Sequence, residues 1–432
     1  MNVLLLYNAT QTYTNTVFEH LNSFAKYSKK AFFFCHHDQN QQFNIDLSKF
    51  DVVVIHYSIR LPYDQISNSA ADALSKYHGL KVLFIQDEYD YTYKTWNWIK
   101  RLGINLVFTV VPTKNIHRIY PQEDFPSVRF INNLTGYVPE DLPIMDKILP
   151  PSKRDIIVGY RGRPLHIKYG QLGRDKIRIG KMVKEYCMLH NIKHDIAWTE
   201  EARIYSDKWY EFIASCRSML GTESGSNVFD WDGSLSARIE EFVKNNSGVN
   251  EDDIYHMIIK PLEQPGLMNQ ISPRCFETIA LRTVLILFEG TYSGILEPWK
   301  HYIPLKKDGS NLDEVFTLLH DENYIDKMVE TAYEEIIASD KYSYRTFVEM
   351  VDKEIEISLN SLMNKPSSIK YKEISSIIPP SPITTVPIRS LPPLQLDMRN
   401  NLTSMLYIVW NKIPARIRFY LKPVIKKILR RQ

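Results

Sequence analysis

The residues best suited to binding a charged ligand lie in the segment 269–308, which begins NQISPRCFETIALRT. Ser272 is a favourable N-cap and Pro273 suits the first helical position, so we predict a helix that begins here. Arg274 lies beside the N-terminus of this helix, where free backbone N–H groups and the helix dipole favour a phosphate. Glu277 follows one turn later, where a carboxylate suits a ribose diol. Ser272, Arg274 and Glu277 are therefore candidate cofactor-binding residues.

Two parts of this segment, SPRCFETIALRTVLI and ILEPWKHYIPLKKDGSNLDEVFTLL, resemble the C-terminal domain of GT-B glycosyltransferases. More narrowly, they are similar to the "glycosyltransferase group 1" type of bacterial surface-polysaccharide enzymes. The resemblance spans roughly residues 1–360 and is strongest over 156–321. In many of these enzymes two glutamates, separated by seven residues, frame the sugar-nucleotide site. Glu277 matches the second, which usually binds the ribose, whereas the first position is occupied by Asn269.

A group of basic residues follows the predicted strand Ile156–Tyr160, in the sequence RGRPLHIKYGQLGRDKIRIG. The resemblance implies a Gly-Arg pair directly after this strand and a lysine five residues on, both in contact with the donor diphosphate. Gly162, Arg163 and Lys168 match that spacing, and Lys176 is a competing candidate. Clustered cationic groups suit a diphosphate because they donate charge-assisted hydrogen bonds to several oxygens. The alternative for each position is an ordinary basic surface residue.

The loop TESGSNVFDWDGS lies after a short predicted strand of the same domain and is expected at the cleft. Small residues there allow a ligand to approach the backbone closely. Its candidate donor contacts are Glu223, Ser224 and Gly225. Asp230 and Asp232 instead resemble the Asp-x-Asp that holds a divalent metal in the other glycosyltransferase fold. We favour a site without metal, because a hard cation needs more oxygen ligands than these two residues supply.

The fold class predicted from the whole chain is α/β. Apolar runs rich in β-branched and aromatic residues alternate with helical patterns, which is typical of doubly wound parallel sheets. Together with the resemblance, this predicts two Rossmann-like domains that face each other across a cleft. The predicted parts are an acceptor domain (1–150), a nucleotide-sugar domain (151–340) and a crossover helix (341–361) that returns to brace the first domain.

Polar residues at the ends of strands in the first domain are expected to face the acceptor, since ligands bind at the carboxyl ends of strands in open α/β sheets. If the enzyme inverts the anomeric centre, a carboxylate or histidine there must take the acceptor proton. Asp87, Glu88 and His56 are the candidate catalytic bases. A retaining enzyme needs no such base, and the sequence leaves this choice open.

Composition indicates a globular protein of 432 residues, with 44% hydrophobic and 24% charged residues. The four cysteines are far apart and form no CxxC pair, which favours a reducing compartment over disulfides or structural zinc. The beginning MNVLLLYNAT predicts a first β-strand rather than a signal peptide. The sequence contains no run of about 18 apolar residues, so no transmembrane helix is predicted.

The last part of the sequence has a different character. Residues 362–395 contain seven prolines among many Ser and Thr, and predict an extended linker. Residues 396–432 form a basic amphipathic tail, whose part from 397 carries nine basic residues against one acidic residue. An apolar stripe flanked by basic residues predicts binding of the tail (397–432) to an anionic membrane surface, with a partner-binding helix as the alternative. Nucleic acid is set aside as a partner, because the apolar stripe has no use there.

The predicted function is transfer of a sugar from a nucleotide sugar (UDP-, GDP- or dTDP-sugar) to the hydroxyl of a glycan or polyprenyl-linked acceptor, without a metal. The predicted location is the cytoplasm, peripherally associated with the inner face of the cell membrane. Two alternatives remain. One is a non-catalytic nucleotide-sugar-binding module of a membrane-associated polysaccharide assembly, for which Asn269 is the support. The other is a sugar-nucleotide epimerase, which would convert the donor with no acceptor.

Overall fold

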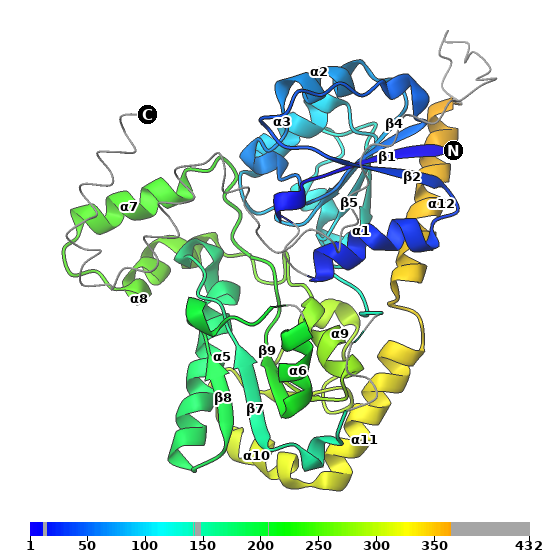
Figure 1. Cartoon of the computed structure of the whole chain (residues 1–432). Coiled ribbons are helices and arrows are strands. Elements are labelled where there is room, and N and C mark those ends of the chain that lie inside the picture. Colours follow the sequence, from blue (N-terminus) through cyan, green and yellow to red (C-terminus); the bar gives the residue numbers. More distant parts are fainter. Residues whose placement is uncertain (12–14, 141, 143–147, 206, 364–432) are drawn as a thin grey trace, which may run out of the picture. The chain divides into compact units, whose positions relative to one another are not determined.

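The computed structural model describes residues 1–11, 15–140, 142, 148–205 and 207–363. These residues belong to one compact unit that contains two parallel β-sheets with helices packed on them (Figure 1). The predicted α/β class with two doubly wound sheets is confirmed. The predicted tail (396–432), its membrane contact and nearly all of the predicted linker lie outside the described residues. None of the described helices is long and apolar enough to cross a bilayer.

The first sheet has six parallel strands in the order β2-β1-β3-β4-β5-β6. Its strands are β1 (Asn2–Tyr7), β2 (Ala31–His36), β3 (Val52–Ile55), β4 (Leu80–Ile85), β5 (Leu106–Thr109) and β6 (Arg129–Asn132). Strands β3, β4 and β5 are buried along their whole length, which requires helices on both faces and explains their continuous apolar sequences. The helices are α1 (Asn15–Tyr27), α2 (Asn68–Lys76), α3 (Thr92–Leu102) and α4 (Ile116–Ile119).

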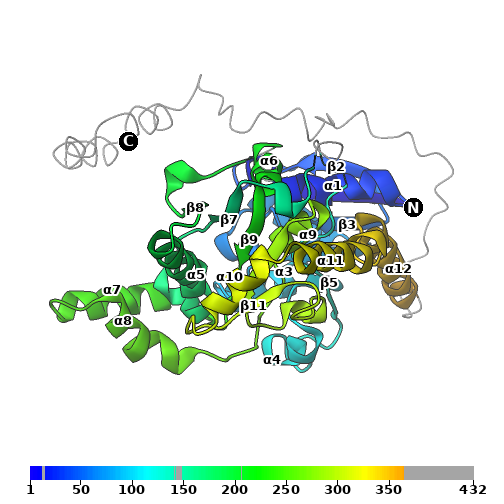
Figure 2. The same ribbon diagram turned by 90° about the horizontal axis from the view of Figure 1, so that it is seen from below.

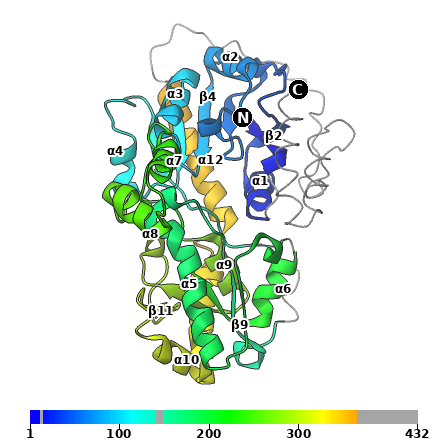
Figure 3. The same cartoon turned by 90° about the vertical axis from the view of Figure 1, so that its left-hand side faces the viewer.

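The second sheet has five parallel strands in the order β11-β10-β9-β7-β8. Its strands are β7 (Ile156–Arg161), β8 (His194–Ala197), β9 (Cys216–Gly221), β10 (Val284–Phe288) and β11 (Ile303–Leu305). The helices are α5 (Gly170–Leu189), α6 (Asp207–Ser215), α7 (Leu235–Asn245), α8 (Glu251–Ile254), α9 (Pro273–Ala280), α10 (Leu312–His320) and α11 (Glu322–Ala332). Figure 2 shows α7 and α8 standing away from the strands of this sheet. Helix α9 lies on the side of the second sheet that faces the first (Figures 1 and 3).

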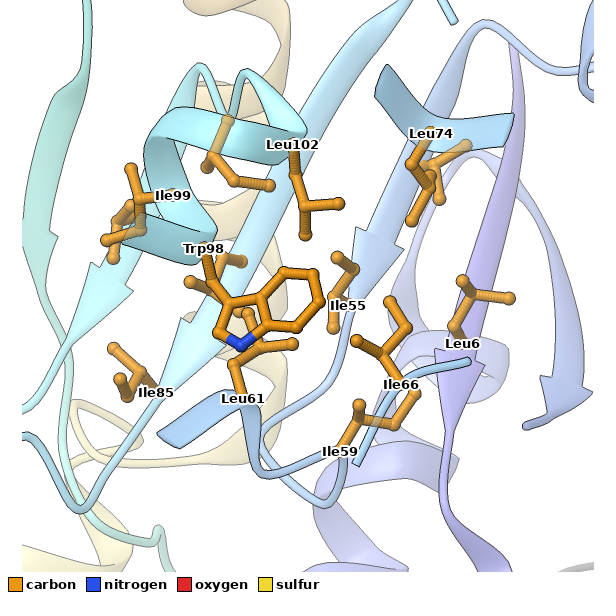
Figure 4. Close-up of a cluster of buried hydrophobic side chains, with 14 of the residues drawn as sticks. Leu6, Ile55, Ile59, Leu61, Ile66, Leu74, Ile85, Trp98, Ile99 and Leu102 are labelled. Atoms are coloured by element: carbon orange, nitrogen blue, oxygen red, sulfur yellow. The ribbon is translucent and has the colours of Figure 1, made fainter. Parts of the chain in front are cut away.

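One core cluster of the first domain lies between the sheet and helices α2 and α3 (Figure 4). Leu74 and Leu102 pack from the two helices toward Ile55 on β3. Trp98 adds the largest ring, and its Nε1 donates a hydrogen bond to Asp64 Oδ1 at 2.9 Å. The indole is therefore packed against apolar side chains while its one polar atom has a partner, as buried tryptophans require.

Helix α12 (Tyr344–Met363) packs against α1 and β4 of the first domain, although it follows the second domain in the chain (Figure 1). Phe347 stacks on Tyr137 with ring centroids 4.5 Å apart. The Asp352 carboxylate accepts hydrogen bonds from the Ser28 hydroxyl at 2.8 Å and from the Lys29 backbone N–H at 3.1 Å. The chain therefore crosses from the second domain back to the first.

Local boundaries differ from prediction where the sheet competes with helix propensity. The sequence pattern predicts a helix over 207–217 and a strand that begins at Ser218, whereas α6 ends at Ser215 and β9 begins at Cys216. Cys216 lies opposite Ile156 in the parallel pairing of β9 with β7, so the ladder extends the strand at the expense of the helix. A second difference concerns α5: the sequence pattern predicts a helix that begins at Ile177, whereas the helix begins at Gly170, seven residues earlier.

Candidate functional site

Three adjoining cavities share Leu165 in their walls, and two of them lie between the two domains. The first has a volume of about 550 Å³ and is lined mainly by residues 57–63, 83–87, 89 and 90 of the first domain, with part of the segment after β7. The second, of about 250 Å³, is lined by the second domain alone. The third, of about 370 Å³, is lined by both domains. These cavities form a continuous candidate site at the carboxyl ends of β4 and β7.

The second cavity is lined by three cationic side chains from three different elements. Arg163 follows β7, Lys176 lies on α5, and Arg274 lies in the first turn of α9, two residues after Ser272. Across the part of the chain that the structure describes, none of these three cations forms an ion pair with a carboxylate. An uncompensated group of cations beside the N-terminus of a helix favours an anionic ligand.

Two of these cations are held by neighbouring groups. Arg274 donates to the carbonyl oxygen of Arg161 at 2.8 Å, and its guanidinium lies 5.1 Å from the centroid of the Tyr160 ring. Lys176 Nζ donates to Ser224 Oγ at 3.4 Å. Burial, together with the positive charge of Arg274, lowers the pKa of Lys176 to about 8. An anion between the two cations would remove their mutual repulsion, which is the electrostatic condition for a diphosphate site.

The small residues of the predicted site occupy close-packed positions. Gly225 lines the first and third cavities with φ of +92°, and a Cβ there would lie 2.0 Å from the Met268 carbonyl oxygen. Ser224 also lines the third cavity, and its backbone pairs with Gln270 in both directions. Gly162 does not line these cavities, but a Cβ there would lie 3.0 Å from the Lys176 carbonyl oxygen. Each glycine therefore lets two backbone segments approach.

The two glutamates of the predicted donor site are buried and have protein partners. Glu277 is 9% exposed, and its Oε2 accepts a hydrogen bond from Trp209 Nε1 at 2.8 Å. Burial raises the pKa of Glu277, against the opposing effects of this bond and of the Arg274 charge. Glu223 Oε1 accepts from the backbone N–H groups of Thr291 and Tyr292 at 3.0 and 2.9 Å, which holds the turn after β10. Neither glutamate lines the second cavity.

The structure places Lys168 away from the second cavity. Its Nζ lies 2.7 Å from Asp90 Oδ1, in an ion pair between side chains that are 12% and 2% exposed. Of the two lysines considered for the diphosphate, Lys176 therefore lies in the cationic cavity and Lys168 does not.

The three candidate bases have different environments. Asp87 lines the first and third cavities, where its carboxylate accepts from Tyr89 Oη at 2.9 Å and pairs with Arg60 at 3.2 Å. Glu88 is fully buried, hydrogen-bonded to the Thr109 hydroxyl, and burial raises its pKa to about 8. His56 is also fully buried, and burial lowers its pKa. Of these three residues only Asp87 lines one of the three cavities described above.

Tyrosines and an arginine that the sequence reasoning missed complete the first cavity. They are Arg60, Tyr63, Tyr89 and Tyr169, which join Tyr57 in its wall. Tyr89 and Tyr169 meet edge to face, with ring centroids 5.5 Å apart, and come from different domains. The signal in the sequence is the tyrosine-rich run EYDYTY at 88–93, directly after β4. Aromatic rings beside carboxylates suit a polyhydroxylated ligand with an apolar face.

The Asp-x-Asp of the loop after β9 is used for local hydrogen bonds. Asp232 Oδ1 accepts from the backbone N–H and the hydroxyl of Ser234, at 2.9 and 2.7 Å. Asp230 Oδ1 accepts from the Leu235 backbone N–H at 3.2 Å, at the start of α7. Each carboxylate thus caps the loop that carries it.

No sequence-family model and no curated protein sequence matches the chain. Solved structures do match it. An alpha-glucosyltransferase in complex with UDP and a 13-mer DNA containing a HMU base aligns at a TM-score of 0.50 and 10% identity, over 82% of this chain and 99% of that one. HepE of Anabaena, in complex with UDP, aligns at 0.45 and 11%, over 83% and 100%. Sucrose-phosphate synthase of Thermosynechococcus elongatus aligns at 0.44 and 10%, over 84% and 100%.

The chain therefore has the GT-B fold, in which two Rossmann-like domains enclose the site. The predicted resemblance to GT-B glycosyltransferases is confirmed at the level of the fold. The exclusion of nucleic acid as a partner was wrong: the matched alpha-glucosyltransferase is itself bound to DNA. The exclusion was argued from the tail alone, which lies outside the described residues, and took no account of the surface around the cleft.

Proposed function

We propose that the protein is a glycosyltransferase that moves a sugar from a nucleoside-diphosphate sugar to an acceptor hydroxyl. The observation that carries the proposal is the group of unpaired cations, Arg163, Lys176 and Arg274, in a cavity that adjoins a larger one lined by tyrosines and Asp87. The smaller cavity suits the diphosphate and the larger one suits the acceptor. The three cavities adjoin, so a sugar can pass from one ligand to the other without leaving the site.

In this mechanism the second domain stabilises the leaving group. When the glycosidic bond breaks, negative charge grows on the diphosphate. The three cations line the cavity beside the N-terminus of α9, and in this proposal they stabilise the charge of the transition state with little reorganisation. Glu277, one turn further along α9, is proposed to act on the ribose side of the nucleotide. UDP is the first nucleotide to test, because the alpha-glucosyltransferase of the same fold is bound to UDP.

The first domain is proposed to present the acceptor. Asp87 is exposed to the cavity and held by Arg60 and Tyr89, so its carboxylate is positioned to orient the acceptor hydroxyl. In an inverting reaction the same carboxylate takes the hydroxyl proton. The anomeric configuration of the product, read by NMR, distinguishes inversion from retention. The acceptor classes that we propose to compare are glycans, polyprenyl-linked glycans and hydroxymethylated DNA.

The test is release of free nucleoside diphosphate from a panel of UDP-, GDP- and dTDP-sugars, with each acceptor class and with water alone. Each reaction is run with and without EDTA, and we expect turnover to persist in EDTA. Arg163→Ala should reduce turnover strongly. Lys181→Met, an exposed lysine on α5, is the matched control and should not. If no nucleoside diphosphate binds and none is released, the proposal is wrong.

Asn269 supports one second candidate, a nucleotide-sugar-binding module without turnover. Its side chain amide donates to Glu223 and accepts from Asn227 at 2.8 Å, so an amide stands where the resemblance implies a carboxylate. This candidate predicts that a nucleotide sugar binds and is never cleaved with any acceptor. An epimerase instead predicts a changed donor sugar with no acceptor present.

A further inference from the structure

Asp90 collects hydrogen bonds from both domains at the edge of the first cavity. It is 1% exposed and lies in the segment after β4. Its Oδ2 accepts from the hydroxyls of Tyr63 at 2.7 Å and Tyr169 at 3.0 Å, and its Oδ1 pairs with Lys168 Nζ at 2.7 Å. Tyr63 belongs to the first domain, whereas Lys168 and Tyr169 belong to the segment between β7 and α5. One buried carboxylate therefore joins two walls of the cavity.

The environment of this carboxylate explains why its partners must stay in place. A buried charge is costly unless it is paired and its remaining lone pairs are hydrogen-bonded. Lys168 provides the opposite charge, and the two tyrosines satisfy the other oxygen. Tyr63, Asp90 and Tyr169 all line the first cavity. The position of each tyrosine hydroxyl is thus tied to the ion pair.

We propose that Asp90 is a positioning residue for the acceptor cavity, and that Lys168 acts through Asp90 on the acceptor side rather than on the donor diphosphate. This inference rests on the proposed function, because the first cavity is an acceptor cavity only if the protein transfers a sugar. The segment 163–169 then serves both ligands: Arg163 at its start faces the cationic cavity, and Lys168 at its end secures the acceptor wall.

The variants must separate loss of the pair from loss of folding. Lys168→Met leaves the Asp90 carboxylate buried and unpaired, and such a change often destabilises a protein. The double variant Lys168→Met with Asp90→Asn removes both charges, and the amide oxygen can still accept from the tyrosines. Lys168→Arg keeps the charge and is the conservative variant expected to restore function. Lys193→Met is the matched control, because Lys193 pairs with Asp155 on the exposed surface.

Three measurements test the proposal on the full-length protein. The first is the affinity for UDP relative to uridine, which the Lys168→Met change, alone or with Asp90→Asn, should leave within twofold of wild type. The second is amide hydrogen exchange in the segment 163–171, which should be at least tenfold faster in both variants and normal in Lys168→Arg and Lys193→Met. The third uses the donor and acceptor identified by the release assay: acceptor KM should rise about tenfold or more, with donor KM within twofold.

The outcomes separate this inference from the proposed function. If affinity for UDP relative to uridine falls tenfold or more in these variants, Lys168 is a diphosphate ligand and the inference is overturned. Unchanged exchange in the segment 163–171 would also overturn it, because Asp90 would not be holding that wall. If wild-type protein neither binds UDP nor releases it, the proposed function fails, while the exchange experiment still decides whether the Asp90–Lys168 pair holds the cavity together.

Discussion

Replacing Lys176 with methionine tests the diphosphate site most directly, because the pKa of this lysine, about 8, lies within the range of an ordinary binding assay. The lysine must be charged to bind a diphosphate well. With this pKa, about 90% of the free protein carries the charge at pH 7 and about 10% at pH 9. A bound diphosphate favours the charged form and therefore raises the pKa of Lys176 in the complex.

The expected consequence is a loss of UDP affinity as the pH rises. Below pH 8 the ammonium is present before and after binding, so affinity is flat. Above pH 8 binding must take up a proton, so affinity should fall about tenfold between pH 7 and pH 9. The phosphate groups of UDP are already ionised in this range, since a terminal phosphate has a second pKa near 6. Uridine has no diphosphate and should show no such dependence.

Isothermal titration of UDP and uridine from pH 7 to 9 measures the effect as a ratio of affinities. Lys176→Met should lower the ratio at pH 7 by roughly ten- to a hundredfold, the usual range for a charged hydrogen bond, and should abolish its pH dependence. Lys181→Met, on an exposed position of the same helix, should behave as wild type. A ratio that stays flat in the wild-type protein, or a slope that survives in Lys176→Met, would refute the assignment.

Three other predictions concern buried or catalytic groups. Glu277→Gln keeps an oxygen that accepts from Trp209. If the carboxylate binds the ribose, this change should weaken the binding of UDP and of uridine equally, by about tenfold or more. Titration of both ligands measures the effect, and a UDP affinity within twofold of wild type would remove Glu277 from the site. Asp87→Asn should slow transfer about 10²- to 10⁴-fold in an inverting reaction. Glu88→Gln changes a residue that lies outside the cavities and should leave donor KM unchanged. A transfer rate that falls more in Glu88→Gln than in Asp87→Asn would contradict the site. Burial lowers the pKa of His20 to about 3, so unfolding takes up a proton below pH 6.5. The free energy of unfolding should therefore decrease as the pH is lowered, by about 2 kcal/mol from pH 7 to pH 5. Urea unfolding should show this pH dependence, and it should be smaller in His20→Gln.

The sequence by itself determined the architecture, because its signals are local. Apolar runs such as Val52–Ile55 and Val284–Phe288 form buried strands, which the alternation of apolar runs with helical patterns predicts. Pro273 begins α9 because a residue without an N–H and with φ fixed near the helical value costs nothing at that position. Alternation of such strands with amphipathic helices leaves few folds, so patterning predicted doubly wound parallel sheets, and the family resemblance added the prediction of two facing domains.

The partner of each polar side chain was decided only by the tertiary structure. Lys168 and Asp90 are 78 residues apart, and no local pattern reveals that the lysine pairs with a buried carboxylate. His56 follows a strand end just as Asp87 does, yet it is fully buried: its ring bonds to His20 at 3.0 Å, and Phe347 of α12 packs on His20 with ring centroids 4.7 Å apart. Residue types and spacing indicate which chemistry is available. Only the packing of segments far apart in the chain decides which of these groups can reach a ligand, because burial and pairing depend on neighbours that the sequence places hundreds of residues away.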